Sequence, residues 1–169
     1  DCSNMCHESS GVALSETLGI GKGSVTLEDF YVTDLIIIMG QNPGTNHPRM
    51  LSALQKAKKA GAKIIAINPL PETGLMGFRH PQKVGDWLGG NPQIADLFLP
   101  VRINGDVALL KAVMLLLLEE EEGPGSVFDH DFIKAHTDGY ENFLQVLRKH
   151  EFQQLVEDSS VPEAKIREM

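Results

Sequence analysis

The residues best suited to chemistry are a cysteine and a histidine that stand side by side near the start of this 169-residue chain. Cys6 offers a soft thiolate, which suits a redox metal, and His7 offers an imidazole that exchanges a proton near neutral pH. Ser9 or Ser10 can cap a helix that runs to about Leu18, and the positive end of a helix lowers the pKa of a nearby thiol. The pattern therefore favours Cys6 as a metal ligand with His7 as the adjacent proton acceptor.

Two other roles for the thiol stay open. A lone cysteine is more often a core residue, so Cys6 can be structural. Cys2, Cys6 and His7 suit zinc, but a structural zinc site needs four ligands and no second ligand pair follows at the required spacing. With two cysteines the chain can build neither a disulfide framework nor an iron–sulfur cluster of its own, which fits a reducing, cytoplasmic setting.

Polar loops follow two apolar runs further along the chain. Leu35–Met39 is apolar throughout, which predicts a strand covered on both faces within a parallel sheet. Residues 48–61 have helical spacing and residues 64–67 form a second apolar run, so these segments predict a right-handed strand–helix–strand unit. We expect the loop at residues 40–48 to leave the carboxyl end of a central strand, where open α/β sheets bind their ligands.

This first loop carries groups that suit a nucleotide. Gly40 allows the backbone to approach a ligand closely, Asn42 offers an amide donor and acceptor, and Thr45 can bond a phosphate oxygen. His47 and Pro48 are expected to shape the turn and to begin the helix that follows.

Two further loops carry similar groups. Asn68 follows the second strand and Glu72 follows shortly after; each carries a polar side chain that can bond a ligand, although a simple turn explains them almost as well. Gly105 and Asp106 follow a strand predicted at residues 96–101 and begin a helix, where capping by Asp106 is the alternative to ligand binding. Because parallel strands place their carboxyl ends together, we expect the three loops to converge at one edge of the sheet.

The remaining pattern predicts a single α/β domain over residues 1–169. Residues 70–93 are rich in glycine and proline and predict an irregular insertion with one short helical turn near residues 86–88. Helices are predicted over residues 129–135, 140–150, 152–156 and 162–169. The predicted fold is a three-layer Rossmann-like α/β domain with a short, mostly parallel sheet, divided into a core at residues 1–125 and a helical extension at residues 126–169.

Two patterns are better explained without a ligand. Gly19-Ile20-Gly21-Lys22-Gly23 does not follow a strand and fits a helix end and turn rather than a phosphate loop. Asp129, His130, Asp131 and His136 look like a metal cluster, but they lie at a predicted helix start, where the dipole favours acids, so we expect a solvated surface.

The composition of the chain argues against some classes of binding partner. The formal net charge of -8 argues against a general nucleic-acid surface or an anionic membrane surface. The longest apolar run, at residues 112–118, is too short to span a bilayer. Small molecules and other protein segments are the expected partners.

Four motifs occur in one order along nearly the whole chain. They are Cys6-His7 with Ser9-Ser10-Gly11-Val12-Ala13-Leu14, the Gly-x-Asn-Pro-x-x-x-His-Pro loop of residues 40–48, Gly61-Ala62-Lys63-Ile64-Ile65, and Asn104-Gly105-Asp106-x-Ala108-Leu109-Leu110. In these motifs the chain resembles the molybdopterin oxidoreductases that carry bis(molybdopterin guanine dinucleotide), and within them the formate dehydrogenase-like branch.

The resemblance implies an enzyme that oxidises or reduces a small substrate by two electrons at molybdenum or tungsten. Cys6 would be the metal ligand, His7 would accept the proton, and Asp106 would bond the guanine base through paired hydrogen bonds. The implied cofactor-binding residues are Gly40, Asn42, Thr45, Asn68, Glu72, Gly105 and Asp106. The chain departs from the family in two places. The segment Ser3-Asn4-Met5 is one residue shorter, and Asn68 replaces the acid of a common Asp-Pro-Arg motif, which the family uses on a ribose hydroxyl. An amide can still bond that hydroxyl, and Glu72 is close enough in sequence to substitute for the acid.

Members of this family are several times longer, and this chain begins at Asp1 without a methionine. We therefore expect a middle fragment of a larger enzyme, inactive by itself. Its partners would be a small-molecule substrate, the remaining domains of the same polypeptide and an electron-transfer partner, and any iron–sulfur cluster would lie in a preceding four-cysteine segment. The alternative is a non-catalytic nucleotide-binding α/β module in which Cys6 is structural.

Overall fold

The computed structural model describes residues 8–77 and 93–169. Cys2, Cys6 and His7 lie outside the described residues, as does the helical turn predicted near residues 86–88. Every structural statement below concerns the two described ranges.

Within these ranges the strands form one parallel sheet in the order β1-β2-β3. The strands are β1 (Leu35–Met39), β2 (Lys63–Ile67) and β3 (Leu97–Leu99). Leu35 pairs with Lys63, and Ile65 pairs with Leu97. The predicted strands and their parallel direction are confirmed, with β3 shorter than the predicted residues 96–101.

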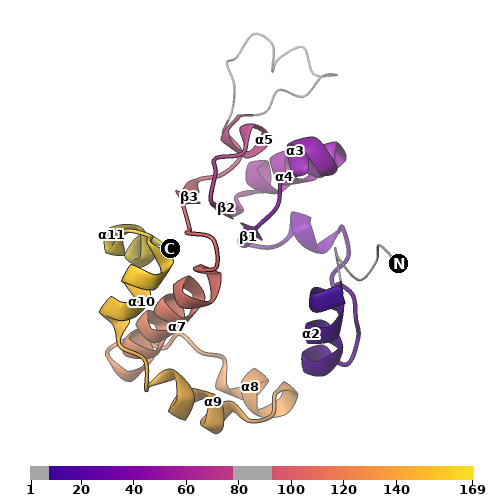
Figure 1. Cartoon of the computed structure of the whole chain (residues 1–169). Coiled ribbons are helices and arrows are strands. Elements are labelled where there is room, and N and C mark those ends of the chain that lie inside the picture. The colour runs from indigo at the N-terminus through magenta and orange to yellow at the C-terminus, as the bar shows by residue number, and fades with distance from the viewer. Residues whose placement is uncertain (1–7, 78–92) are drawn as a thin grey trace.

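Helices cover the two faces of the sheet (Figure 1). On one face α4 (Pro48–Ala60) buries Leu51, Leu54 and Ala57 against β1 and β2. On the other face α7 (Asp106–Glu122), α10 (Phe152–Ser159) and α11 (Glu163–Glu168) pack against β2 and β3. The predicted three-layer Rossmann-like α/β arrangement is confirmed.

The crossover helix α4 has the sequence signals that its position requires. Pro48 occupies its first turn, where the missing N–H costs no helical hydrogen bond. Gly61 ends it with φ 115°, a left-handed conformation that a side chain would strain. The chain therefore turns directly into β2 after the helix.

The strand β1 lies at the edge of the sheet, so its predicted central position is wrong. Ile36 and Ile38 are buried against α4, but Leu35 is 45% exposed and Ile37 is 46% exposed. The helices on that second face cover β2 and β3, and of β1 they reach Met39. An unbroken apolar run therefore did not distinguish a strand covered on both faces from an edge strand covered on one.

The remaining elements flank these layers. They are α2 (Glu8–Leu18), η1 (Asp29–Tyr31), α3 (Pro43–Asn46), α5 (Thr73–Met76), α8 (His130–His136) and α9 (Tyr140–Leu147). The helix α2 buries none of its residues and stands apart from the other helices in Figure 1. Ser9 and Ser10 lie inside its first turn, so neither is the predicted cap.

The carboxyl-terminal helices divide into two groups. Leu155, Val161 and Ile166, from α10 to α11, belong to the core on the second face of the sheet. By contrast, α9 packs Leu144 and Leu147 against Leu118 at the far end of α7. In the described ranges, no helix combines the length and the apolar character needed to cross a bilayer.

Asp96 fixes the amino-terminal edge of the sheet. Its carboxylate accepts hydrogen bonds from the Ile64 backbone N–H and the Lys58 ammonium, both at 2.9 Å. Desolvation acts to raise the pKa of Asp96, but the bonds from Lys58 and Ile64 and the nearby Lys58 and Lys63 charges outweigh it and lower the pKa. Asp96 thus joins the end of α4 to the first residues of β2 and β3.

Glu121 organises the junction between α7 and α8. Its carboxylate accepts hydrogen bonds from the backbone N–H groups of Val127 at 2.6 Å and Phe128 at 2.9 Å, and His130 Nε2 lies 2.7 Å from its other oxygen. The bonds from Phe128, His130 and Val127 hold the pKa of Glu121 at about 2. Asp129 caps α8 by accepting from the Phe132 N–H, which confirms the predicted helix start.

We predict that Glu121→Gln destabilises the chain at pH 7 and that this effect disappears in acid. The folded chain releases the Glu121 proton more readily than the unfolded chain, so the contribution is complete above about pH 4.5 and is lost as the pH falls toward about 2. Urea unfolding of the wild-type chain and the variant at several pH values measures this contribution to the free energy of unfolding. Glu122→Gln is the matched control, because Glu122 makes only an exposed ion pair with Arg148. Equal effects of the two substitutions at pH 7 would contradict the assignment.

Candidate functional site

The three predicted loops leave the same edge of the sheet. The Gly40 N–H donates to the carbonyl oxygen of Ile67 at 3.0 Å, and the Asn68 N–H donates to that of Leu99 at 3.2 Å. The carboxyl end of β1 is thus bonded to that of β2, and the carboxyl end of β2 to that of β3, as the parallel pairing requires. The expectation is confirmed for the strand ends and for the loops after β1 and β2, which contact each other. Among the described residues, the backbone bond and the ion pair of Arg102 join the third loop to α10 instead, so Gly105 and Asp106 are not brought together with the first two loops.

In the first loop Asn42 is the central side chain. It caps α3, because its Oδ1 accepts from the Thr45 N–H at 3.1 Å. Its Nδ2 donates to Glu72 Oε2 at 2.5 Å, so its amide is bonded at both ends. Gly40 precedes it with φ 67°, is exposed, and has open space where a side chain would stand.

The second loop directs its polar side chains toward the first. Asn68 is buried, at 5% exposed, and its Nδ2 donates to the Gln41 carbonyl oxygen at 2.9 Å. Glu72 accepts from Asn42, as described above. Both residues that the sequence placed in the second loop therefore connect it to the loop after β1.

A pair of glycines holds the two loops in direct backbone contact. A Cβ added to Gly74 in α5 would lie 2.9 Å from the Cα of Gly44 in α3, and one added to Gly44 would lie 3.2 Å from the Cα of Gly74. Contacts under 3.0 Å require a shift of the backbone. No local sequence pattern predicts this contact, because only the fold brings the two glycines together.

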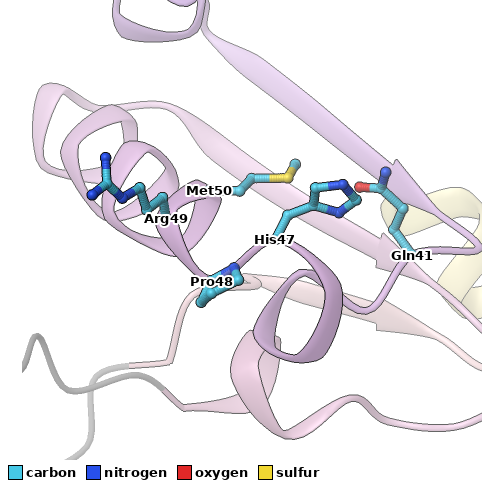
Figure 2. Close-up of a pocket in the computed structure, with 5 residues that line it drawn as sticks. All are labelled: Gln41, His47, Pro48, Arg49 and Met50. Carbon is cyan, nitrogen blue, oxygen red and sulfur yellow. The ribbon is translucent and has the colours of Figure 1, made fainter.

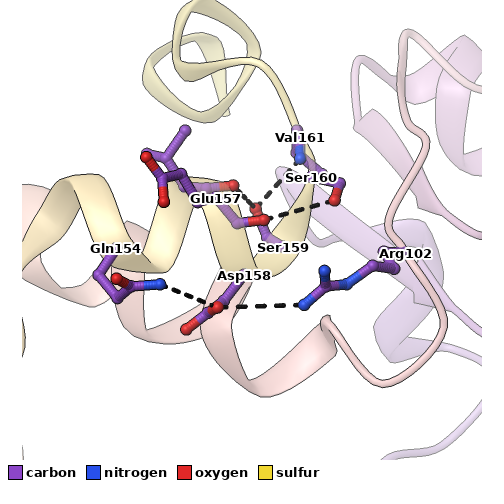
Figure 3. A network of polar contacts seen from close by, with 8 residues as sticks. Arg102, Gln154, Glu157, Asp158, Ser159, Ser160 and Val161 are labelled. Atoms are coloured by element: carbon purple, nitrogen blue, oxygen red, sulfur yellow. Dashed lines mark hydrogen bonds and ion pairs between the residues drawn. The ribbon is translucent and has the colours of Figure 1, made fainter.

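The third loop is anchored to α10 (Figure 3). The Arg102 N–H donates to the Ser159 carbonyl oxygen at 3.0 Å, and the Arg102 guanidinium lies 4.0 Å from Asp158. Gly105 is buried against this helix end, where an added Cβ would meet the Asp158 carbonyl oxygen at 3.0 Å. The loop thus starts at the shared edge and is fixed by the opposite helical layer.

Asp106 is not the predicted N-cap. Gly105 occupies the cap position without a side-chain bond, and Asp106 is the first residue of α7 and partly exposed. The reason is that Asn104, with φ 67°, and the close packing of Gly105 place the start of the helix at Asp106, one residue earlier than a cap at Asp106 would need. The carboxylate therefore lies in the first helical turn, where the dipole favours a negative charge.

A hollow of about 600 Å³ lies beside the first loop (Figure 2). It is lined by Gln41, His47, Pro48, Arg49 and Met50. In Figure 2 the His47 ring lies between the Gln41 amide and the Met50 thioether, while Arg49 extends to the other side of the helix start. Gln41 and Arg49 were missed by the sequence analysis, although both are polar neighbours of the residues it selected.

The described ranges contain the candidate cofactor-binding residues but not the candidate metal ligand. Gly40, Asn42, Asn68 and Glu72 are brought together, and Thr45 is bonded to Asn42. Cys6 and His7 lie outside these ranges. Among the described residues, no three His, Cys, Asp or Glu side chains are grouped closely enough to hold a metal ion.

Comparison with known proteins gives relatives along the full chain. No model of a protein family matches it. An uncharacterized oxidoreductase of Mycobacterium tuberculosis (strain ATCC 25618 / H37Rv) is 59% identical over 144 residues, which are 85% of this chain and 18% of that protein. Protein YdeP of Escherichia coli (strain K12) is 45% identical over 175 aligned residues, which cover 100% of this chain and 23% of that protein.

More distant relatives carry more specific names. The F420-dependent formate dehydrogenase 2 subunit alpha of Methanococcus maripaludis is 28% identical over 99% of this chain and 21% of its own length. Acetylene hydratase from Pelobacter acetylenicus shares the fold, with a TM-score of 0.72 and 20% identity over 98% of this chain and 19% of that one. The chain thus spans about a fifth of the length of these proteins, one of which is named an oxidoreductase and one a formate dehydrogenase subunit.

We predict that Gly74→Ala destabilises the chain by about 1–3 kcal/mol, because the new methyl group overpacks the backbone contact with Gly44. The matched control is Gly23→Ala, since a Cβ at Gly23 meets nothing within 4 Å and should change the unfolding free energy by less than about 0.5 kcal/mol. Chemical denaturation measures both. Equal stability of the two variants would show that the loops do not touch in solution.

Proposed function

We propose that this chain is the cofactor-binding and metal-ligating portion of a molybdenum- or tungsten-dependent oxidoreductase similar to formate dehydrogenase. In this proposal bis(molybdopterin guanine dinucleotide) lies along the carboxyl edge of the sheet. The whole enzyme carries out a two-electron oxidation or reduction of a small substrate, and the remaining domains and an electron-transfer partner complete it.

One observation carries the proposal: polar residues from loops far apart in sequence meet at the carboxyl edge of a parallel sheet. There the Asn42 amide donates to Glu72 and the Asn68 amide donates to the Gln41 carbonyl oxygen. The Gly40 N–H donates to the carbonyl oxygen of Ile67, next to Asn68. This edge is where open α/β sheets bind nucleotides. The similarity to a formate dehydrogenase alpha subunit along 99% of the chain supports the same assignment.

The residues present fit a phosphate-bearing nucleotide. Open space over the exposed Gly40 leaves room for a ligand to approach the backbone. The His47 ring lines the neighbouring hollow beside Gln41, whereas Arg49 extends to the other side of the helix start (Figure 2). An arginine fork matches phosphate oxygens in geometry and charge, so Arg49 suits a phosphate on that side. Asp106, which is not used as a cap, can accept two hydrogen bonds from a guanine edge.

Two residues outside the described ranges have the chemical roles in this proposal. The Cys6 thiolate ligates the metal, and the adjacent His7 accepts the proton released from the substrate because an imidazole titrates near neutral pH. The bound group would supply the two-electron redox chemistry. The residues of the sheet edge bind and orient it.

We predict that the full-length protein contains molybdenum or tungsten with guanine dinucleotide, and that Cys6→Ser abolishes its turnover while its melting temperature is retained. A serine hydroxyl is a harder and far less acidic ligand than a thiol, so it cannot replace the thiolate. Metal analysis, nucleotide release and turnover measure this. Near wild-type turnover with metal bound, or zinc alone at one equivalent, would favour the non-catalytic module with a structural Cys6.

We predict that His7→Ala in the full-length enzyme slows turnover and alters its pH dependence without loss of metal. The proton acceptor would be removed while ligation by Cys6 remains. The pH profile of kcat is the measurement, with His136→Ala, an exposed residue of α8, as the control. An unchanged profile would remove His7 from the mechanism.

A further inference from the structure

The second loop of the candidate site contacts the first loop through the side chains of Asn68 and Glu72. The Asn68 amide donates to the Gln41 carbonyl oxygen, and the Glu72 carboxylate accepts from the Asn42 amide. The Gly44–Gly74 backbone contact sets the spacing of the same two loops. Side chains that the sequence suggested for a ribose are therefore engaged with the protein.

Glu72 determines which way the Asn42 amide faces. With Nδ2 toward the carboxylate, Oδ1 is left to accept from the Thr45 N–H and to cap α3. The reversed amide would place its oxygen against the Glu72 carboxylate and its NH₂ group against the Thr45 N–H, and both contacts would be repulsive. Glu72 therefore sets the orientation of the Asn42 amide, whose oxygen then bonds the Thr45 N–H.

Asn68 acts in the same way on Gln41. Its Nδ2 is a donor in a buried position, 5% exposed, facing the Gln41 carbonyl oxygen at 2.9 Å. An aspartate here would place a carboxylate oxygen against that carbonyl, and an ionised acid has no donor to offer. This gives a physical reason for an amide where the resemblance leads one to expect an acid.

We propose that Asn68 and Glu72 are positioning residues for the nucleotide. They act through Gln41 and Asn42, while direct contacts come from the first loop, from the backbone at Gly40 and Gln41 and the hydroxyl of Thr45. The inference rests on the proposed function, because it assigns how the same site holds its guanine dinucleotide.

The first test is Asn68→Asp in the full-length protein, which restores the acid. If Asn68 touched the ribose, aspartate would keep or strengthen nucleotide binding. Positioning predicts the opposite: the rate at which guanine nucleotide is lost on dialysis rises by about tenfold or more, because a buried hydrogen bond is replaced by a repulsion. An unchanged or slower loss from the folded variant overturns the role of Asn68.

The second test is a double-mutant cycle between Glu72 and Asn42, read by the same nucleotide-loss rate. Glu72→Ala should accelerate loss, Glu72→Gln should stay near wild type because its amide oxygen still accepts from Asn42, and Glu72→Ala should add nothing once Asn42→Ala is present. Additive effects would mean that Glu72 touches the ligand itself. A lower melting temperature with unchanged nucleotide loss would mean a purely structural role, and either outcome overturns the proposal.

Two safeguards separate the possible failures. A buried carboxylate at position 68 can itself unfold the chain, and in that case the partly exposed Glu72 decides the test. Wild-type protein that releases no guanine nucleotide would overturn the proposed function, and the positioning roles with it. Wild-type protein that does release guanine nucleotide, with Asn68→Asp tolerated, would overturn the positioning role alone.

Discussion

The central strand β2 is the constraint on which the rest of the structure depends. It is hydrogen-bonded to a parallel neighbour on each side, and Ile64 to Ile67 are all buried. Parallel pairing requires every connection to cross over the sheet, which places helices on the faces and collects the carboxyl ends of the strands at one edge. The position of the candidate site follows from that single arrangement.

The site edge is held by contacts among its own loops. Two side-chain hydrogen bonds and a glycine–glycine contact join the loops after β1 and β2, and α10 holds the loop after β3. A site assembled before its ligand arrives loses less conformational entropy on binding. The fold shared with acetylene hydratase does not select the reaction, since one fold supports many chemistries.

Most elements were predictable from local pattern. The helix α4 begins at Pro48, because proline fixes a helical φ and its missing N–H is not needed there. It ends before Gly61, because glycine accepts a left-handed backbone conformation. The predicted central position of β1 was wrong, because an apolar run has the same sequence pattern in an edge strand as in a central strand. The cap at Asp106 was wrong because the packing of Gly105 on α10 decides where α7 begins, and that packing involves residues more than fifty positions away.

The sequence by itself determined which groups could bind a nucleotide and that they would share an edge, because residue type sets hydrogen-bonding capacity and parallel strands align their ends. Only the tertiary structure decided what those groups bond to. Asn68 meets Gln41, Asn42 meets Glu72, and Gly44 meets Gly74 through the relative placement of two loops some thirty residues apart. Such pairings depend on the distance and angle between elements. The packing of α4 against the sheet sets that distance and angle, and no local pattern in the chain specifies them.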